Sequence, residues 1–181
     1  MMPVMTAPDI SEDDGLVRAA AAGDRAAFGE LYVRYARLVH GILLARVPSE
    51  EADDLVQDVF LSAMRQLRGL RTVAAFRGWL AAIARNRAMD YFRQARPRVP
   101  LEENMNHESR APADEFDALE ILEVIQRLPE AYREPMILRL VEGMTGPEIA
   151  RQTGLTADSV RVNLCRGMKM LRSLLGGVEA K

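Results

Sequence analysis

The sequence contains a single cysteine, Cys165, and aromatic residues make up only 6% of its 181 residues. One cysteine excludes an internal disulfide and favours a reducing compartment. No apolar run approaches the roughly 20 residues that span a bilayer. The first residues, MMPVMTAPDISEDD, lack the basic start and apolar core of a signal peptide. These absences predict a cytoplasmic protein with no membrane insertion.

Residue patterns that mark active sites are equally scarce. His40 and His107 have no metal-ligand spacing with Cys165. Neither a nucleophile–base pair nor a phosphate-binding loop is visible. We therefore expect no metal, no cofactor and no enzymatic activity.

The composition that is present favours an all-α fold. Hydrophobic residues make up 49% and charged residues 28% of the chain, which is ordinary for a folded protein and too apolar for disorder. Alanine, leucine, arginine and glutamate are abundant, and no strand-like alternation appears. A chain of this length forms one domain or two small ones.

The N-terminal third predicts a tail followed by two helices. Residues 1–14 contain proline and acids without periodicity, and we expect a loose tail there. From Gly15 onward apolar residues recur at steps of three and four. Gly23 and Asp24 predict a break between two helices, because glycine ends helices and aspartate begins them.

The segment VPSEEADDLVQDVFLSAMRQLRGL predicts the next helix. Ser49 is the expected N-cap, and the acids that follow suit the positive end of the helix dipole. Phe60 and Leu61 are adjacent, so both cannot be buried on the inner side. That inner stripe is predicted to consist of Leu55, Val59 and Met64.

Positive charge gathers in FRGWLAAIARNRAMDYFRQARPR, residues 76–98, although the whole chain carries a formal charge of −2. Its second half holds Arg85, Arg87, Arg93, Arg96 and Arg98. We interpret Trp79, Tyr91 and Phe92 as packing residues rather than stacking platforms. Residues 101–117 are polar and acidic, and this change of charge predicts a linker between two domains.

The C-terminal segment predicts a helix-turn-helix. Thr145 and Glu148 have capping-box spacing, Gly154 provides the turn, and Thr156 caps a second helix. The buried side of that helix is predicted to hold Val160, Leu164 and Leu171, whereas Arg161, Arg166, Lys169 and Arg172 avoid it. Such bases often only solvate a helix face. Their restriction to the second helix favours nucleic-acid binding.

Both halves resemble the sigma-70 family, and specifically the extracytoplasmic-function (ECF) RNA polymerase sigma factors. EEADDLVQDVFLSAM and FRGWLAAIARNRAMDYFRQARPR resemble region 2, and LPEAYREPMILRLVEGMTGPEIARQTGLTADSVRVNLCRGMKMLR resembles region 4. The resemblance implies an all-α fold with two small helical domains joined by a flexible acidic linker. It implies region 2 at residues 15–100, a linker at 101–117 and region 4 at 118–176.

The resemblance also implies partners and site residues. The expected partners are core RNA polymerase, through its β′ clamp helices and β flap, promoter DNA, and an anti-sigma factor. The positions that match the clamp contact are Asp53, Asp54, Gln57, Phe60 and Leu61, although Asp53 and Asp54 also suit simple dipole stabilisation. The −10 contacts would be Arg71, Arg85, Asn86, Arg87 and Arg93, with the LRTVAA loop forming a pocket for a flipped base. The −35 contacts would be Ser159, Arg161, Val162, Cys165, Arg166 and Lys169.

The second helix departs from the family pattern. The family usually reads like TVKSRLHRAR, whereas this chain reads SVRVNLCRGM, with Val162, Asn163 and Met168 at positions that are usually polar or basic. Fewer bases predict weaker phosphate binding with a flatter salt dependence. Gly167 predicts a loss of helix stability of about 1 kcal/mol relative to alanine.

Alternative functions remain open on the sequence. One is a sigma-like decoy that sequesters an anti-sigma factor without binding DNA, although the retained bases count against it. Another is a helix-turn-helix repressor that reads operators alone, but no ligand pocket or dimer seam is visible in the N-terminal half. A redox switch at Cys165 is less favoured than a structural role, because cysteine usually behaves as a small hydrophobe.

Overall fold

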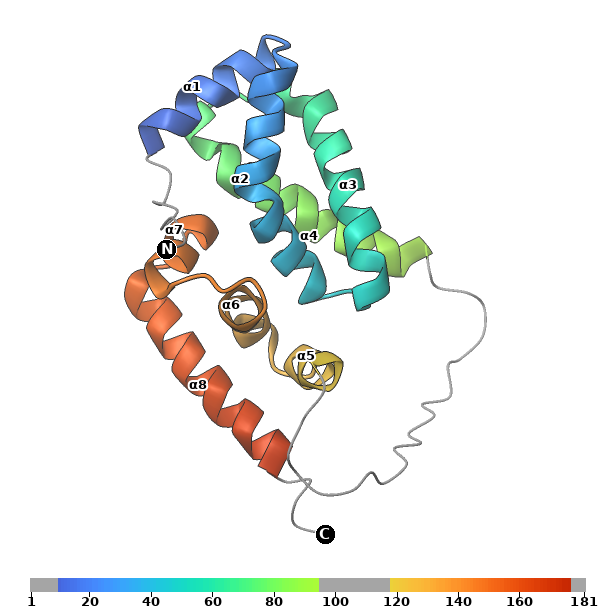
Figure 1. Cartoon of the computed structure of the whole chain (residues 1–181), viewed down its shortest axis with the longest axis vertical. Helices are drawn as coiled ribbons and strands as arrows, with labels where there is room; N and C mark the ends of the chain where they lie inside the picture. Colours follow the sequence, from blue (N-terminus) through green and yellow to red (C-terminus); the bar gives the residue numbers. More distant parts are fainter. Residues whose placement is uncertain (1–9, 95–117, 177–181) are drawn as a thin grey trace, which may run out of the picture.

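The computed structural model describes residues 10–94 and 118–176, and that part of the chain is helical throughout, with no strand (Figure 1). It forms two packed groups of helices, as the sequence predicts. The N-terminal group comprises α1 (Ile10–Ala21), α2 (Arg25–Leu44), α3 (Ser49–Gln66), the short 3-10 turns η1 (Leu67–Gly69) and η2 (Val73–Ala75), and α4 (Phe76–Gln94). The C-terminal group comprises α5 (Ala118–Gln126), α6 (Glu130–Leu140), α7 (Gly146–Thr153) and α8 (Ala157–Gly176).

The predicted break between α1 and α2 is confirmed. Gly23 has φ 105°, a conformation that glycine adopts without steric cost. The Asp24 carboxylate accepts hydrogen bonds from the backbone N–H groups of Ala26 (2.8 Å) and Ala27 (3.1 Å). It thereby satisfies two of the unpaired donors at the start of α2.

The prediction of a loose tail over residues 1–14 is wrong for its last part, because α1 begins at Ile10. Asp13 is buried, and its carboxylate accepts hydrogen bonds from the Tyr35 hydroxyl (2.5 Å) and from Arg34 Nη1 (3.0 Å). Burial and the Asp13 hydrogen bond raise the pKa of Tyr35 to about 12. The start of α1, which has no helical periodicity in the sequence, is therefore stabilised by hydrogen bonds from Arg34 and Tyr35, more than 20 residues away.

The described part of α3 corrects two expectations. Ser49 is the first helical residue and Pro48 occupies the N-cap position, with no side-chain hydrogen bond there. Met64 is 48% exposed, because Ala63 and Leu67 occupy the inward positions beyond Phe60. The expectation that Phe60 and Leu61 cannot both be buried is confirmed, since Phe60 is buried whereas Leu61 is exposed.

The predicted helix-turn-helix geometry of α7 and α8 is confirmed. Glu148 Oε2 accepts a hydrogen bond from the Thr145 backbone N–H (2.7 Å), and the Glu148 N–H donates to Thr145 Oγ1 (3.4 Å), which completes the capping box. These bonds lower the pKa of Glu148. Gly154 ends α7 with φ 77°, and Thr156 Oγ1 accepts a hydrogen bond from the Ser159 N–H (3.1 Å).

Gly167 has a packing role that the sequence did not reveal. It is buried where α8 crosses α6, and a Cβ atom there would lie 2.8 Å from Met136 Cγ and 3.4 Å from Tyr132 Cβ. The expectation that Gly167 merely weakens the helix is therefore incomplete, because this glycine lets the two helices approach closely.

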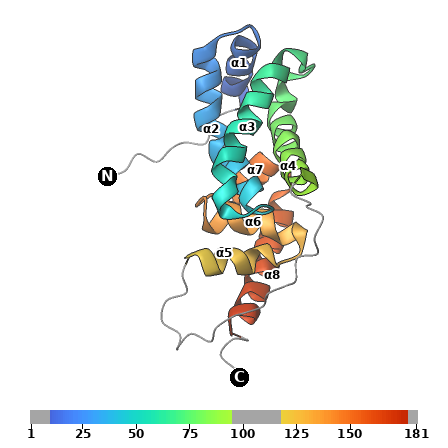
Figure 2. The same ribbon diagram turned by 90° about the vertical axis from the view of Figure 1, so that its right-hand side faces the viewer.

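The two groups of helices also pack on each other. The C-terminal half of α2 lies beside α6 (Figures 1 and 2). Helix α4 contacts α7, where Arg77 donates a hydrogen bond to the Arg151 carbonyl oxygen. The buried core continues from one group into the other. Within the described residues no helix is both long and apolar enough to cross a membrane.

Candidate nucleic-acid interface

The second helix of the helix-turn-helix presents a continuous solvent face. Figure 1 shows α8 along the outer edge of the C-terminal group. Val160 and Leu171 are buried beneath it. The predicted −35 contacts Arg161, Val162, Cys165, Arg166 and Lys169 are all exposed, and Ser159 is half-buried. The structure thus brings these six predicted residues together on one helix.

The charges on this face are available to a ligand. Arg161 Nη2 lies 3.3 Å from Asp158 Oδ1, but both side chains are more than three-quarters exposed. Such a solvent-screened pair within one helix contributes little to stability and exchanges readily for another partner. No ion pair within the described residues involves Arg166 or Lys169, which leaves both cations free for phosphates or base edges.

The predicted −10 contacts on α4 are placed differently. Arg85 donates to the buried carboxylate of Glu134 in α6, with Nη2 2.7 Å from Oε1. Arg87 forms an ion pair with Asp58 of α3, and Arg93 forms one with Asp90 of its own helix. Arg85 and Arg87 are therefore paired with carboxylates of other helices, whereas the pair of Arg93 lies on the surface of its own helix.

Asn86 and Arg71 are exposed members of the predicted −10 set, as is Arg93. Asn86 lies on the solvent face of α4, and Arg71 lies between η1 and η2. No hydrogen bond or ion pair within the described residues engages either side chain. The structure therefore places one polar side chain and two cations of this set in solvent, of which only Arg93 has a carboxylate partner among the described residues.

Of the three α4 aromatic residues expected to pack rather than to stack on bases, Trp79 and Tyr91 are half-buried and Phe92 is exposed. Trp79 is half-buried beside Phe76, with ring centroids 5.8 Å apart, and Tyr91 is also half-buried. Phe92 differs, because its ring is 50% exposed and meets Tyr91 edge to face at 5.4 Å. The reason is positional: Phe92 follows Tyr91 directly, so the two side chains leave α4 in different directions. Residues 96 and 98, which complete the predicted arginine cluster, lie outside the described residues.

The predicted polymerase-binding residues form an exposed strip along α3, with one exception. Asp53, Asp54, Gln57 and Leu61 are exposed. Phe60 is only 4% exposed and packs beneath the strip against Tyr32, with ring centroids 4.5 Å apart. Phe60 can therefore shape this surface from below but has little area to offer a partner.

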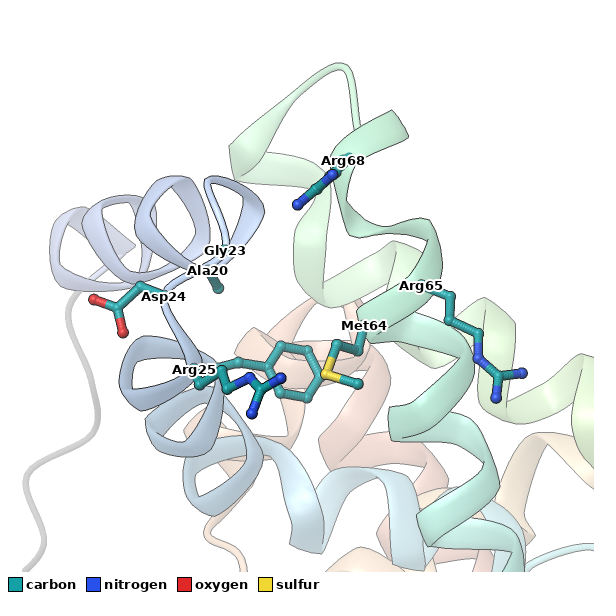
Figure 3. Close-up of a pocket in the computed structure, with 8 residues that line it drawn as sticks. Ala20, Gly23, Asp24, Arg25, Met64, Arg65 and Arg68 are labelled. Atoms are coloured by element: carbon teal, nitrogen blue, oxygen red, sulfur yellow. The ribbon is translucent and has the colours of Figure 1, made fainter.

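Sequence reasoning missed a hollow of about 270 Å³ between the α1–α2 turn and the end of α3 (Figure 3). Phe28 and Met64 line it, and Arg25 and Arg68 stand at its margin. Asp24 is turned away because it caps α2, and Arg65 also points outward. The sequence carried no signal for it, because Met64 was assigned to the inner stripe and only the structure brings the α1–α2 turn beside Met64 and Arg68.

Cys165 is an exposed free thiol on the α8 face. Among the described residues no three histidine, cysteine or acidic side chains are grouped so as to hold a metal ion. The structure gives Cys165 no partner within that part of the chain, and its position suits a contact on the nucleic-acid face better than the core role expected for a small hydrophobe.

Comparison with known proteins gives matches to both halves. Residues 31–98 match the family model for sigma-70 region 2, and residues 118–171 match the model for sigma-70, region 4. The chain is 34% identical to the RNA polymerase sigma factor NccH of Alcaligenes xylosoxydans xylosoxydans, over 92% of this chain and 96% of that protein. It is 30% identical to the ECF RNA polymerase sigma-E factor of Escherichia coli K12, over 88% and 92% of the two chains.

Solved structures give the same match. The structure of CnrH in complex with the cytosolic domain of CnrY superposes with a TM-score of 0.61 at 29% identity, covering 93% of this chain and 99% of CnrH. The sigma factor RpoE of Bartonella quintana, in complex with the anti-sigma factor NepR, matches with a TM-score of 0.52 over 82% of this chain. At 20% identity the second match supports the fold alone.

Proposed function

The chain belongs to the sigma-70 family as an RNA polymerase sigma factor of the ECF type, and we propose that it selects promoters by reading their −35 and −10 elements. As a sigma factor it is an initiation factor rather than an enzyme. The proposal places it in the cytoplasm, where core polymerase and promoter DNA are found. Three surfaces divide the work: α8 for the −35 element, α4 with the η1–η2 loop for the −10 element, and α3 for core polymerase.

The exposed face of α8 is the observation that carries the proposal. Arg161 and Arg166 lie on it without a strong internal partner, and arginine recognises guanine edges and phosphates bidentately. Val162 offers an apolar contact of the kind that suits a thymine methyl group. A decoy that never touches DNA would not need these exposed bases, so we prefer the DNA-reading function.

The −10 element would be opened by α4 and the η1–η2 loop. Unstacking costs roughly 1.4 kcal/mol per base step, and extruding a base costs a few kcal/mol. Contacts to the backbone and to the unstacked bases must offset that cost. Asn86, Arg71 and Arg93 are already exposed for this role. Arg85 and Arg87 must first exchange a carboxylate of another helix for a phosphate.

Core polymerase would bind the exposed strip of α3. Asp53 and Asp54 offer negative charge near the N-terminus of the helix, and Leu61 offers exposed apolar area two turns further on. This arrangement suits a partner helix that carries basic residues at one end. We further propose an anti-sigma factor as a regulator, because the sigma factor RpoE of Bartonella quintana, which shares this fold, was solved in complex with the anti-sigma factor NepR.

Run-off transcription tests the proposed function. Bacterial core polymerase is mixed with genomic DNA fragments, with and without this protein, and the new RNA 5′ ends are sequenced. We expect discrete new start sites that share two upstream elements. An absence of new starts, with an active core and a working control sigma factor, would refute the function and leave the decoy as the better explanation.

A further inference from the structure

We propose that the hollow between the α1–α2 turn and the end of α3 receives one unstacked base, with its flanking phosphates, from the DNA strand just downstream of the −10 element (Figure 3). The inference rests on the proposed function, because only a promoter that this protein opens supplies that strand. It adds to that function a second single-strand contact, separate from the residues predicted to bind the −10 element.

The floor of the hollow is apolar. Phe28 of α2 and Met64 of α3 line it, and Met64 is 48% exposed. The Phe28 ring is half-buried and held edge to face against Phe60, with ring centroids 6.3 Å apart. Single-stranded nucleic acids bind where their bases can stack on such side chains. A volume of about 270 Å³ lies just below the roughly 300–1,000 Å³ of sites for drug-sized ligands, so the hollow suits one planar ring.

Unpaired positive charge surrounds this floor. Arg25 and Arg68 stand at the margin of the hollow, and no hydrogen bond or ion pair within the described residues engages either guanidinium. Most other arginines of residues 10–94 form an ion pair with a carboxylate: Arg18, Arg34, Arg37, Arg46, Arg85, Arg87 and Arg93. A guanidinium that no carboxylate holds can bind a phosphate without first breaking an ion pair. Arg25 and Arg68 therefore suit the phosphates on either side of a bound base.

No acid opposes this charge inside the hollow. Asp24 is the only acidic residue among those that line it, and its carboxylate instead accepts hydrogen bonds from the backbone N–H groups of Ala26 and Ala27. Figure 3 shows this carboxylate turned away from Met64. The hollow therefore favours an anionic ligand with an apolar face, and a nucleotide unit of single-stranded DNA combines the two.

The hollow continues the proposed −10 surface. Arg68 belongs to η1, and Arg71 follows it in the link to η2. A Cβ atom added to Gly23 would lie 3.8 Å from Arg68 Nη2, so this guanidinium reaches from η1 to the α1–α2 turn. A strand that passes Arg71 therefore meets Arg68 and then the hollow. In an open promoter the DNA upstream of the −10 element stays double-stranded, whereas the strand downstream is single up to the start site, so the occupant comes from the downstream side.

Arg68→Ala tests the site, with Arg65→Ala as the matched control. Both arginines are exposed near the end of α3, and both changes remove one positive charge, but Arg65 points away from the hollow (Figure 3). The probes are two fluorescent single strands that carry the −10 element found by run-off transcription. One ends at that element, and the other continues a few nucleotides downstream. Fluorescence anisotropy gives their affinities for polymerase holoenzyme assembled with the full chain.

We expect the longer strand to bind the parent more tightly than the shorter one. Arg68→Ala should remove most of that gain and lower the magnitude of the salt slope for the longer strand by about 0.7, the value for one phosphate of a single strand. Phe28→Leu, which removes the flat ring but keeps an apolar side chain, should reduce the gain about fivefold or more. Arg65→Ala should leave it unchanged. Affinity for the shorter strand should be the same in all four proteins, which also shows that each variant is folded.

Three results would overturn the site. One is an equal gain in the parent, Arg68→Ala and Phe28→Leu. Another is an equal loss in Arg68→Ala and Arg65→Ala, which would indicate only a general attraction by positive charge. The third is unchanged strand binding with weaker assembly on core polymerase, which would assign the hollow to an acidic protein surface. If the parent holoenzyme does not bind even the shorter strand, the proposed function itself is refuted, and the site with it.

Discussion

Gly167→Ala should raise the stability of the protein if helix propensity dominates at this position, and lower it if packing dominates. Propensity alone predicts that alanine stabilises α8 by about 1 kcal/mol. The structure places the new Cβ 2.8 Å from Cγ and 3.0 Å from Sδ of Met136, which is fully buried. Overpacking of this kind costs about 1–3 kcal/mol. The two effects combine to a net loss of about 0–2 kcal/mol, so we expect the variant to be less stable than the parent.

The assay is urea unfolding followed by two signals. Circular dichroism reports helices in both domains, whereas fluorescence of Trp79, the only tryptophan, reports the N-terminal domain. A loss of about 1 kcal/mol moves the midpoint by roughly 0.5 M, for a slope of about 2 kcal/mol per molar urea. The shift should appear first in circular dichroism, because Gly167 packs only on the C-terminal domain.

Gly78→Ala is the matched control for this prediction. Gly78 lies in α4, and a Cβ atom added there would meet nothing within 4 Å, so propensity acts there alone. We expect that variant to equal or exceed the parent in stability. If Gly167→Ala is stabilised as much as Gly78→Ala, the close approach of α8 to Met136 does not constrain this position, and the packing argument is refuted.

Four further predictions follow from the same structure. Asp13→Ala should destabilise the N-terminal domain by about 1–3 kcal/mol in urea unfolding, because it leaves the buried Tyr35 hydroxyl without its acceptor and removes one of the two carboxylates that pair with Arg34. The hydrogen bond of the His40 ring to the Glu142 carboxylate raises the pKa of His40 above 6.5, so the contribution of this pair to stability is complete below pH 6.5 and is lost as the pH rises through the folded-state pKa. Thermal unfolding from pH 6 to 9 should show that decline, and His40→Gln should remove it. Arg166→Ala should weaken binding to a −35 duplex by about 1–3 kcal/mol in fluorescence anisotropy, and unchanged binding would exclude a base contact. Asn86→Ala should slow promoter opening, measured by permanganate reactivity, without altering −35 binding; equal opening rates would give Asn86 a structural role.

Local sequence signals predicted most of the helices and several of their ends. The capping box at Thr145, the glycine turn at Gly154 and the aspartate cap at Asp24 each depend on residues two to four positions apart. The exposed face of α8 follows in the same way from apolar residues at helical spacing. These features could be predicted because hydrogen bonds and helix periodicity act over a single turn.

Contacts between distant residues decided the rest. The start of α1 depends on Asp13 meeting Tyr35, and the inner face of α3 depends on which side chains α2 brings to it, so Met64 was assigned to the wrong side. The sequence indicated that Arg85 is a cation available to DNA, but Glu134, 49 residues away, forms an ion pair with it. Likewise, only the close packing of Leu138 against Gly41 and of Met136 against Gly167 explains why these two helical positions hold glycine. The sequence by itself determined which segments are helices and which face of α8 is polar, whereas only the tertiary structure decided which charges remain available, because pairing and burial depend on neighbours that the chain brings together by folding.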